Sequence, residues 1–338
     1  MVTVSARALV IHREPVARYN PRRDNKSLDA SGTSGLVIDN LSVTQLFPAA
    51  STQSLCVFPF RGIVRKVIGQ PKDFIVMADK DLSSYQAQHD SIREEFKKQA
   101  ESWGKSEISS HLQWVVDRLS LQPHFEVLDV AAGSALLSRA ISPRVKQVVA
   151  SDITPEMLAQ GQSEGDRQGI TNISFEQGAA EALPYPNARF DMVLTRFSVH
   201  HFKSPDVVIR EMRRVCRHGG NVVVIDIVSS EDEKLATRYN NVERIRDSSH
   251  TQALSPSGLK RIVEDAGVKI LNYYSREVEN SVDDWLDFTH TEENQRRQIL
   301  ELMQRELKGD VETGMRPFLK EDKLMFMHTW GIVIGEKG

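Results

Sequence analysis

Two acidic residues and a turn of small residues are the first features of the sequence that could do chemistry. Residues 125–141 read FEVLDVAAGSALLSRAI, an apolar strand that enters a small-residue turn and leaves it as a helix. Asp129 ends the strand, and the small side chains at 131–135 let the backbone approach a ligand closely. Asp152 ends the next apolar run, where one carboxylate can accept hydrogen bonds from both hydroxyls of a ribose. The turn could hold a dinucleotide or another adenosine compound, or it could only connect two elements.

The dinucleotide interpretation requires the pattern G-x-G-x-x-G after the first strand. The matching positions are Ala131, Gly133 and Leu136, and a leucine at the third position would obstruct close packing of the helix on the strand. No phosphate loop of the pattern G-x-x-x-x-G-K-[ST] occurs either. The sequence therefore argues against pyrophosphate binding, and a nicotinamide-dependent oxidoreductase is kept only as an alternative function.

Strands and helices alternate around this turn. Apolar runs predict five strands, at FEVLDV, KQVVASD, ISFEQG, FDMVLT and NVVVIDIV. One helix is expected to begin at Thr154-Pro155-Glu156, with Thr154 as its N-cap. Another is expected to begin at Ser204-Pro205-Asp206 and to end at Gly219-Gly220. This alternation predicts a parallel sheet with helices on both faces.

The regular alternation has different flanks on its two sides. Before it, apolar positions three and four apart predict helices at 92–103 and 110–121. After it, the pattern predicts helices at 231–266 and 283–307 and strands at 268–278 and 323–337. Because no crossover helix proper joins the last two strands, they can form an antiparallel pair at one edge of the sheet.

Four motifs follow one another in order along residues 125–230. They are VLDVAAGSA, ASDITPEML, GAAEALPYPNARFDMVLTRFSVHHF and VIREMRRVCRHGGNVVVID. With these motifs the chain resembles a class I S-adenosylmethionine-dependent methyltransferase, within the broad group of ubiquinone and menaquinone C-methyltransferases and their small-molecule relatives. The resemblance implies a doubly wound, mostly parallel seven-stranded sheet, a Rossmann-like methyltransferase fold with helical lid insertions and an antiparallel final strand.

The same resemblance implies a function and a division of the chain. It implies methyl transfer from S-adenosylmethionine to the oxygen, carbon or nitrogen of a small organic acceptor, with secondary or quinone metabolism as the setting. The methyltransferase domain would span 86–338, with N-terminal helices at 86–124, a cofactor-binding core at 125–230, and an acceptor lid with the last two strands at 231–338. Residues 1–85 would form an N-terminal extension outside it, partly disordered or targeting.

The resemblance also assigns cofactor-binding residues at the strand ends. Asp129, Ala131, Gly133 and Ala135 take the positions of the cofactor loop, Asp152 binds the ribose, Ile153 and Met157 flank the adenine, Ala180 and Glu181 lie beside the adenine amine, and Arg196 lies near the methionine end. The family usually has glycine at the position of Ala135 and often aspartate at that of Ala179. A methyl group at 135 could crowd the cofactor if the residue needs a positive φ angle. We therefore expect weaker or adjusted cofactor binding.

His200 and His201 are the candidate catalytic residues. They follow the fourth strand, near the crevice that opens where the strand order of a doubly wound sheet reverses. Histidine titrates near neutral pH and can take a proton from an acceptor. The alternative is that one of the pair packs in the loop or caps it. Without another nearby histidine or cysteine, the pair is a poor metal site, and no metal is expected.

A second polar cluster, in RIRDSSHTQALS, contains Arg246, Asp247 and His250. It lies after the helix that follows strand five, where this family builds the lid over its acceptor. Arg246 and His250 are therefore candidates for binding a polar acceptor. The alternative is that Asp247 is only a turn residue before the helix that begins at Ser255-Pro256.

Composition limits the partners and the compartment. The 43 basic and 46 acidic residues nearly balance, so a nucleic-acid partner is not expected. A membrane span would need a run of about 18 apolar residues, and the sequence has none. We expect the chain in the cytoplasm, or in a mitochondrion or plastid if the arginine-rich residues 1–23 are a transit peptide. Nothing in the sequence indicates an oligomeric state.

A second enzyme class has the same cofactor. The protein could bind S-adenosylmethionine without transferring its methyl group and use the sulfonium as a fixed charge in a pericyclic or elimination step. The alanines at 135 and 179 keep this alternative open. The mass of the product distinguishes the two, because methylation adds a methylene unit whereas isomerisation leaves the mass unchanged.

Overall fold

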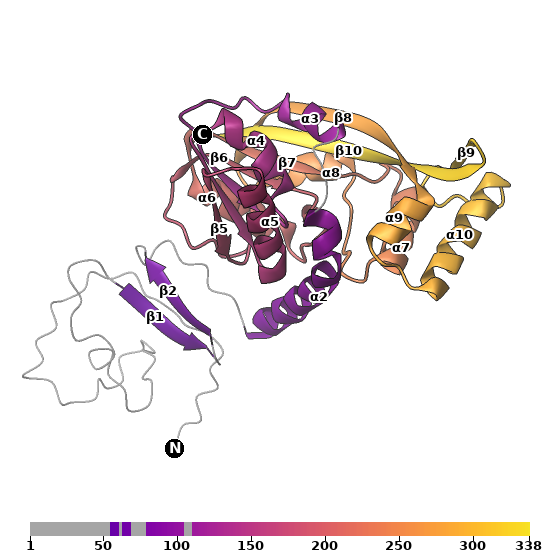
Figure 1. Cartoon of the computed structure of the whole chain (residues 1–338), viewed down its shortest axis with the longest axis horizontal. Coiled ribbons are helices and arrows are strands. Elements are labelled where there is room, and N and C mark those ends of the chain that lie inside the picture. Colours follow the sequence, from indigo (N-terminus) through magenta and orange to yellow (C-terminus); the bar gives the residue numbers. More distant parts are fainter. Residues whose placement is uncertain (1–54, 61–62, 69–78, 105–109) are drawn as a thin grey trace, which may run out of the picture. The chain divides into compact units, whose positions relative to one another are not determined.

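The computed structural model describes residues 55–60, 63–68, 79–104 and 110–338 of the chain (Figure 1). The chain divides into two compact units, Met1–Ser84 and Tyr85–Gly338. In the first unit, strand β1 (Leu55–Phe60) pairs with strand β2 (Ile63–Ile68) in antiparallel register. The possible transit peptide at 1–23 lies outside the described residues.

The second unit contains one mixed sheet. Its strands are β3 (Glu126–Val130), β4 (Gln147–Asp152), β5 (Ile173–Gln177), β6 (Phe190–Arg196), β7 (Cys216–Ile227), β8 (Val268–Ser281), β9 (Phe318–Lys320) and β10 (Lys323–Lys337). Their order is β5-β4-β3-β6-β7-β10-β8, and the short β9 pairs with β10. The five strands β3, β4, β5, β6 and β7 are parallel to one another, whereas β10 is antiparallel to both β7 and β8. This confirms the predicted doubly wound, mostly parallel sheet, to which the structure adds β9.

Burial explains why the five core strands were recognisable as apolar runs. In the central strand β3, Val127, Leu128 and Val130 are all fully buried. Helices cover both faces of a parallel sheet, so its inner strands are apolar on both sides instead of alternating with polar residues. The edge strand β8, by contrast, mixes buried and exposed residues along its length.

Helices pack on both faces of the sheet (Figure 1). The helices of the described residues are α2 (Asp79–Gly104), α3 (Ser110–Val116), α4 (Leu136–Ile141), α5 (Pro155–Arg167), α6 (Pro205–Val215), α7 (Glu233–Arg246), α8 (Pro256–Asp265), α9 (Val282–Phe288) and α10 (Glu293–Leu307), with 3-10 turns η2 (Ser142–Arg144) and η3 (Val199–His201). On one face, α6 and α8 pack on Val222 and Val224 of β7. On the other, α3 and α4 share a cluster with Val223 and Ile225. The alternation along β7 is that of a strand buried on both sides.

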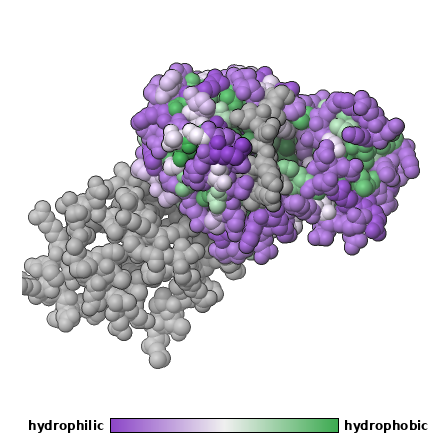
Figure 2. Space-filling view, in the orientation of Figure 1, coloured by the Kyte–Doolittle hydropathy of each residue, from purple (hydrophilic) through white to green (hydrophobic). Residues whose placement is uncertain are grey.

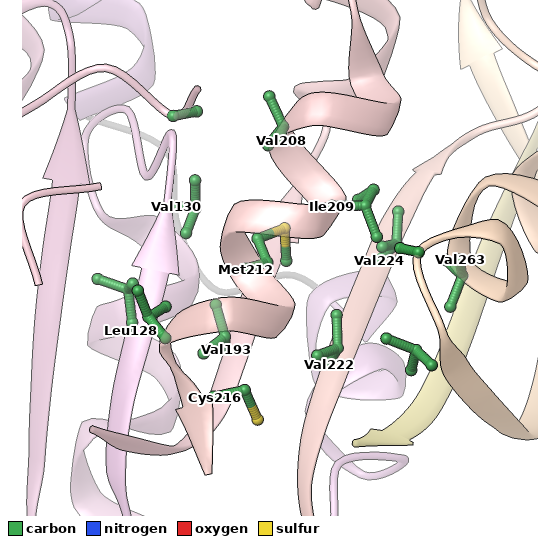
Figure 3. Close-up of a cluster of buried hydrophobic side chains, with 14 of the residues drawn as sticks. Leu128, Val130, Val193, Val208, Ile209, Met212, Cys216, Val222, Val224 and Val263 are labelled. Carbon is green, nitrogen blue, oxygen red and sulfur yellow. The ribbon is translucent and has the colours of Figure 1, made fainter. Parts of the chain in front are cut away.

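Helix α6 shows how strongly this packing is determined by sequence. Val208, Ile209 and Met212 on its inner face are fully buried, and Figure 3 shows them beside the β3 and β7 side chains. Burying each such side chain contributes about 1.5 to 3 kcal/mol. A third cluster joins α7, α9 and α10 to Phe326 of β10 and to Ile227 at the end of β7.

Several element boundaries differ from the sequence expectations. Helix α6 ends at Val215, before Gly219-Gly220, because Cys216 already pairs with Phe190 as the first residue of β7. Thr154 occupies the N-cap position of α5, but its side chain makes no capping hydrogen bond. The helix expected at 92–103 starts earlier, as α2. The regions 231–266 and 283–307 each form two helices instead of one. The helix expected at 110–121 is α3, which already ends at Val116.

The described surface of the second unit is mainly hydrophilic, as the purple colour in Figure 2 shows. The large hydrophobic side chains exposed within the described residues are Leu271, Leu307 and Leu319. Among the helices of this part of the chain, none has both the length and the apolar character needed to cross a bilayer.

Candidate functional site

A cavity lies at the carboxyl ends of β3, β4 and β6. It is lined by the β3–α4 turn, the ends of β4 and β6, the η3 turn and one face of α2. The strands β4 and β6 flank β3 on opposite sides, so the cavity lies where the strand order reverses, as expected for ligand binding in such sheets.

The β3–α4 turn contains three left-handed residues. The φ angles of Ala131, Gly133 and Ala135 are 54°, 55° and 56°. A left-handed conformation costs an L-residue about 1 to 2 kcal/mol, so both alanines are strained where glycine would not be. Ala135 is fully buried and is not among the residues that line the cavity. Its methyl group therefore adds strain behind the cavity wall.

The same turn is fastened to the tip of β4 by Asp152. The backbone N–H of Gly133 donates to Oδ2 of Asp152 at 2.7 Å, and the N–H of Thr154 donates to Oδ1 at 2.8 Å. Burial raises the pKa of Asp152, although these backbone N–H groups oppose the shift. Each carboxylate oxygen keeps a further lone pair. The structure thus joins the two residues that were expected to hold one ligand between them.

The other expected cofactor residues divide between the cavity and its surroundings. Ile153, Met157, Ala180, Glu181 and Arg196 line the cavity together with Ala131, Gly133 and Asp152. Asp129 does not line it: its side chain is 1 % exposed and accepts a hydrogen bond from Ser138 Oγ at 2.6 Å. Burial raises the pKa of Asp129 to about 7.

Arg196 is a half-buried residue with an unpaired donor. Its Nε atom is buried and has no hydrogen-bond partner within the described residues. Burial lowers its pKa to about 10, while the carboxylates of Asp129 and Asp226 favour the charged form. The guanidinium lies 4.2 Å from the ring centroid of Phe197. Such a group is suited to bind an anionic part of a ligand in the cavity.

Sequence analysis did not identify the contribution of α2. His89, Ile92 and Phe96 line the cavity, and Nε2 of His89 lies 3.2 Å from both carboxylate oxygens of Glu181. Arg93 Nε donates to the carbonyl of Ile153. The spacing of three and four residues would have placed these side chains on one helical face, but the helix was expected to begin only at residue 92.

The two adjacent histidines have different environments. His200 does not line the cavity; its Nδ1 lies 2.5 Å from Asp226 Oδ1, and its backbone N–H donates to Asp226 Oδ2. Burial alone would lower the pKa of His200, but the Asp226 carboxylate outweighs this and raises it. His201 lines the cavity, and burial lowers its pKa to about 4. Only His201 is therefore placed to meet a ligand there.

Behind His201 lies a short chain of hydrogen bonds. Its Nδ1 is 3.0 Å from Ser249 Oγ, and Ser249 Oγ donates to Asp247 Oδ1 at 2.6 Å. All three side chains are buried. Asp247 is thus linked to the cavity through Ser249, whereas the sequence suggested only an acceptor lid or a turn.

The two residues expected to bind the acceptor do not line the cavity. Arg246 forms an ion pair with Glu243 at 3.1 Å and lies over the ring of Trp285. The Nε2 of His250 lies 2.7 Å from Asn240 Oδ1, and its ring centroid is 5.3 Å from that of His200. Sequence analysis named His250 but did not place it beside His200 and His201. Even so, the described residues contain no group of three or more side chains arranged to hold a metal ion.

Comparisons with known proteins agree with this geometry. Residues 128–224 match a family model described as a methyltransferase domain. Over 165 residues the chain is 32 % identical to the uncharacterized methyltransferase YcgJ of Bacillus subtilis, covering 48 % of this chain and 65 % of that protein. Over 129 residues it is 32 % identical to the ubiquinone/menaquinone biosynthesis C-methyltransferase UbiE of Shewanella frigidimarina, covering 37 % and 51 %. The chain thus matches about half to two thirds of the length of these relatives.

Solved structures show the same fold. A Bacillus halodurans protein described as a candidate methyltransferase matches with a TM-score of 0.63 and 26 % identity, covering 68 % of this chain and 99 % of that one. The YcgJ protein from Bacillus subtilis matches with a TM-score of 0.62 and 25 % identity, covering 67 % and 97 %.

Proposed function

We propose that this chain, in which residues 128–224 match a methyltransferase domain, is a class I S-adenosylmethionine-dependent methyltransferase that transfers a methyl group to a small organic acceptor in the cavity. The observation that carries the proposal is the bond between Gly133 N–H and Asp152 Oδ2, at the strand reversal point and on the cavity wall. In sheets of this kind, a carboxylate at the end of one strand binds the ribose of a ligand that lies against the glycine turn of the neighbouring strand.

The residues present fit the family's cofactor. Asp152 would accept hydrogen bonds from the ribose hydroxyls, and Ile153 and Met157 would flank the adenine. A ligand can come close to Gly133 because glycine has no side chain. A Cβ at this position would fill that space and approach Met157 Cε to 3.0 Å. The guanidinium of Arg196, which lines the cavity, would meet the carboxylate at the methionine end. When bound, the cofactor supplies a methyl group on a positively charged sulfur.

The chain's own contribution to the reaction would be orientation, exclusion of water and removal of a proton. In-line displacement requires the acceptor atom to be aimed at the methyl carbon in a site that is closed to water. The cavity wall is largely apolar around its few polar groups, and α2 covers one side through Ile92 and Phe96. His201 is the candidate base for an acceptor that must lose a proton.

The identity of the acceptor belongs to this proposal as well. A quinone-like or other secondary metabolite is supported by the resemblance to the ubiquinone and menaquinone C-methyltransferases. Mass spectrometry of extracts incubated with the protein and methyl-labelled cofactor would report the acceptor. A labelled product heavier by one methylene unit supports transfer, whereas an isomer of unchanged mass supports the pericyclic alternative.

Cofactor binding is tested directly by calorimetry with S-adenosylhomocysteine. Asp152→Ala should weaken binding by about 10- to 100-fold, because hydrogen bonds to a charged group are worth about 1.5 to 3 kcal/mol. Asp166→Ala, at an exposed position on the adjoining helix α5, is the matched control and should bind as the native protein does. Absence of heat with the native protein, or equal affinity in the Asp152 variant, would refute the proposal.

A further inference from the structure

The hydrogen-bond chain behind His201 has only one possible direction. The Asp247 carboxylate accepts at Oδ1 from both the backbone N–H and the hydroxyl of Ser249, as an ionised carboxylate does. The Ser249 hydroxyl must therefore donate its single hydrogen to Asp247. Having no second hydrogen, Ser249 Oγ can only accept from His201, so the hydrogen must lie on Nδ1 of the imidazole. A neutral His201 then carries its free lone pair on Nε2.

The remaining nitrogen is the one available to the cavity. His201 is a lining residue, and its Nε2 makes no hydrogen bond within the part of the chain that the structure describes. It is also absent from the fully buried, unpaired polar atoms of those residues, a set that does include Nδ1 of His250. The lone pair of a neutral His201 is thus open to a ligand.

Several hydrogen bonds hold the segment that contains His201 against the segment that contains Ser249. The N–H and Oγ1 of Thr251 both donate to the carbonyl of His200 at 2.7 Å. Gln88 Nε2 from α2 donates to the carbonyls of both His201 and Ser249. The edge of the Phe96 ring packs on the His201 imidazole, with centroids 5.0 Å apart. The orientation of the ring is therefore fixed from several sides.

We propose that Ser249 and Asp247 are positioning residues that keep the proton on Nδ1 of His201, so that Nε2 takes the proton from a hydroxyl group of the acceptor. This inference rests on the proposed methyl transfer and narrows the acceptor to a hydroxyl-bearing molecule that is neutral when it binds. A neutral amine is nucleophilic enough to attack the methyl group before it loses a proton, so it would not need this arrangement.

The proposed step is balanced in atoms and charge. The O–H bond of the acceptor breaks and its proton goes to Nε2, while an electron pair of that oxygen forms the bond to the methyl carbon. The bond between carbon and sulfur breaks, and its electron pair stays on sulfur. One positive charge leaves the sulfur as another forms on the imidazole, so the net charge of the cavity does not change. The products are a methyl ether, a thioether and a protonated His201.

The charges around His201 determine its protonation state. Burial and the neighbouring His200 lower its pKa to about 4, although the carboxylates of Asp247 and Asp226 act to raise it. The ring of His250 lies 6.4 Å away, and α2 contributes only the uncharged Phe96 and Gln88 to direct contact. His201 is therefore neutral before the reaction, and the imidazolium formed returns its proton readily to solvent.

The test reads the ring proton directly by NMR. The full-length protein is labelled with 15N-histidine, and ring correlations are recorded at neutral pH without cofactor, with His201→Gln assigning the signals. We expect Nδ1 to be protonated in native protein and in Ser249→Thr, which keeps the hydroxyl. The exposed neighbour variant Ser248→Ala should match the native spectrum, whereas Ser249→Ala should move protonation towards Nε2. A proton on Nε2 in the native protein, or no change in Ser249→Ala, would overturn the inference.

A second readout separates this inference from the proposed function. Ser249→Ala should bind S-adenosylhomocysteine within about twofold of native affinity but incorporate methyl label about 10- to 100-fold more slowly from extracts, since a positioned base contributes at least this much. The label should be found on a hydroxyl oxygen; label on an amine nitrogen would overturn the inference while leaving methyl transfer intact. Failure of native protein to bind S-adenosylhomocysteine would count against the proposed function instead, whatever the NMR result.

Discussion

The proposed cofactor end of the site, at Gly133 and Asp152, and its proposed acceptor end, at His201 and Ser249, are built in different ways. At the cofactor end, Gly133 and Asp152 are 19 residues apart and lie at the tips of paired strands, joined through a backbone N–H. At the acceptor end, His201 and Ser249 are 48 residues apart and meet through their side chains, and loop hydrogen bonds to the His200 carbonyl, not strand pairing, join their segments. The sheet therefore positions the first end, whereas tertiary packing of the segment after α7 positions the second.

Buried charges fix the C-terminal side of the acceptor end. Glu243 of α7 is fully buried, 3.1 Å from both Arg246 and Nε2 of His328 on β10. Burial raises the pKa of Glu243, but Arg246 and His328 outweigh this and hold it well below its usual range. The group ties α7 to β10 directly before the segment that carries Asp247 and Ser249.

The largest expected effect follows from breaking this group. Glu243→Gln leaves Arg246 buried without its counter-charge, so the free energy of unfolding should fall by about 3 to 5 kcal/mol. Chemical denaturation measures the change, and the exposed Glu301→Gln on α10 is the matched control. A change below about 1 kcal/mol would contradict this account of the acceptor end.

The same group predicts a dependence on pH. Because the folded pKa of Glu243 is depressed, its contribution to stability is present above the usual glutamate pKa and is lost as the pH falls through the folded value. Native protein should therefore lose more stability on acidification than Glu243→Gln does. If the two proteins lose stability in parallel below the usual glutamate pKa, the ion pair does not contribute as described.

The two ends also differ in how far the sequence could predict them. The fold and the cofactor end followed from apolar runs and from an acid at a strand tip, because strand pairing places Asp152 beside β3 wherever the loops go. Asp129 was named for its position in the motif, but the structure turns it to Ser138 and away from the cavity. A motif gives a residue's position along the strand, and packing decides what its side chain contacts.

At the acceptor end the sequence could only name candidates. It could not tell His200 from His201, because adjacent residues in a 3-10 turn point in different directions and only their partners, Asp226 and Ser249, distinguish them. Arg246 was expected at the acceptor, but the intrahelical pair with Glu243 turns it towards Trp285. The i,i+3 spacing of Glu243 and Arg246 is visible in the sequence, but the contact with Trp285 is not.

A smaller effect is expected at the cofactor end. In Gly133→Ala the residue must keep a φ angle of 55°, and its new methyl group would lie 3.0 Å from Met157 Cε. We expect about a tenfold loss of affinity for S-adenosylhomocysteine and a loss of about 1 to 2 kcal/mol in the free energy of unfolding. Gly169→Ala is the control, because φ there is 70° but no atom lies within 4 Å of the added carbon.

That control separates backbone strain from ligand contact. Gly169→Ala should lose stability to a similar extent, yet bind the ligand as tightly as the native protein does. Calorimetry of both variants gives the comparison. Equal affinities in all three proteins would mean that the β3–α4 turn does not approach the cofactor, and the cofactor end would then have to be placed elsewhere.

The smallest effect comes from relieving strain in the same turn. Ala135→Gly removes the cost of a left-handed alanine, about 1 to 2 kcal/mol, but the unfolded chain gains flexibility that offsets about 0.4 to 1 kcal/mol of it. The net gain in the free energy of unfolding should be about 0.5 to 1 kcal/mol. The control, Ala188→Gly, has the same φ angle of 56° at an exposed position outside the cavity, and because it loses no buried methyl group it should gain at least as much.

Ligand affinity distinguishes strain from crowding at this position. Because Ala135 does not line the cavity, we expect Ala135→Gly to bind S-adenosylhomocysteine within about twofold of the native protein, as Ala188→Gly should. A gain of tenfold or more in Ala135→Gly alone would show that the methyl group does reach the ligand, as the usual glycine of the family suggests. The cofactor end would then be limited by a single side chain, and its difference from the packing-dependent acceptor end would be smaller than the backbone geometry implies.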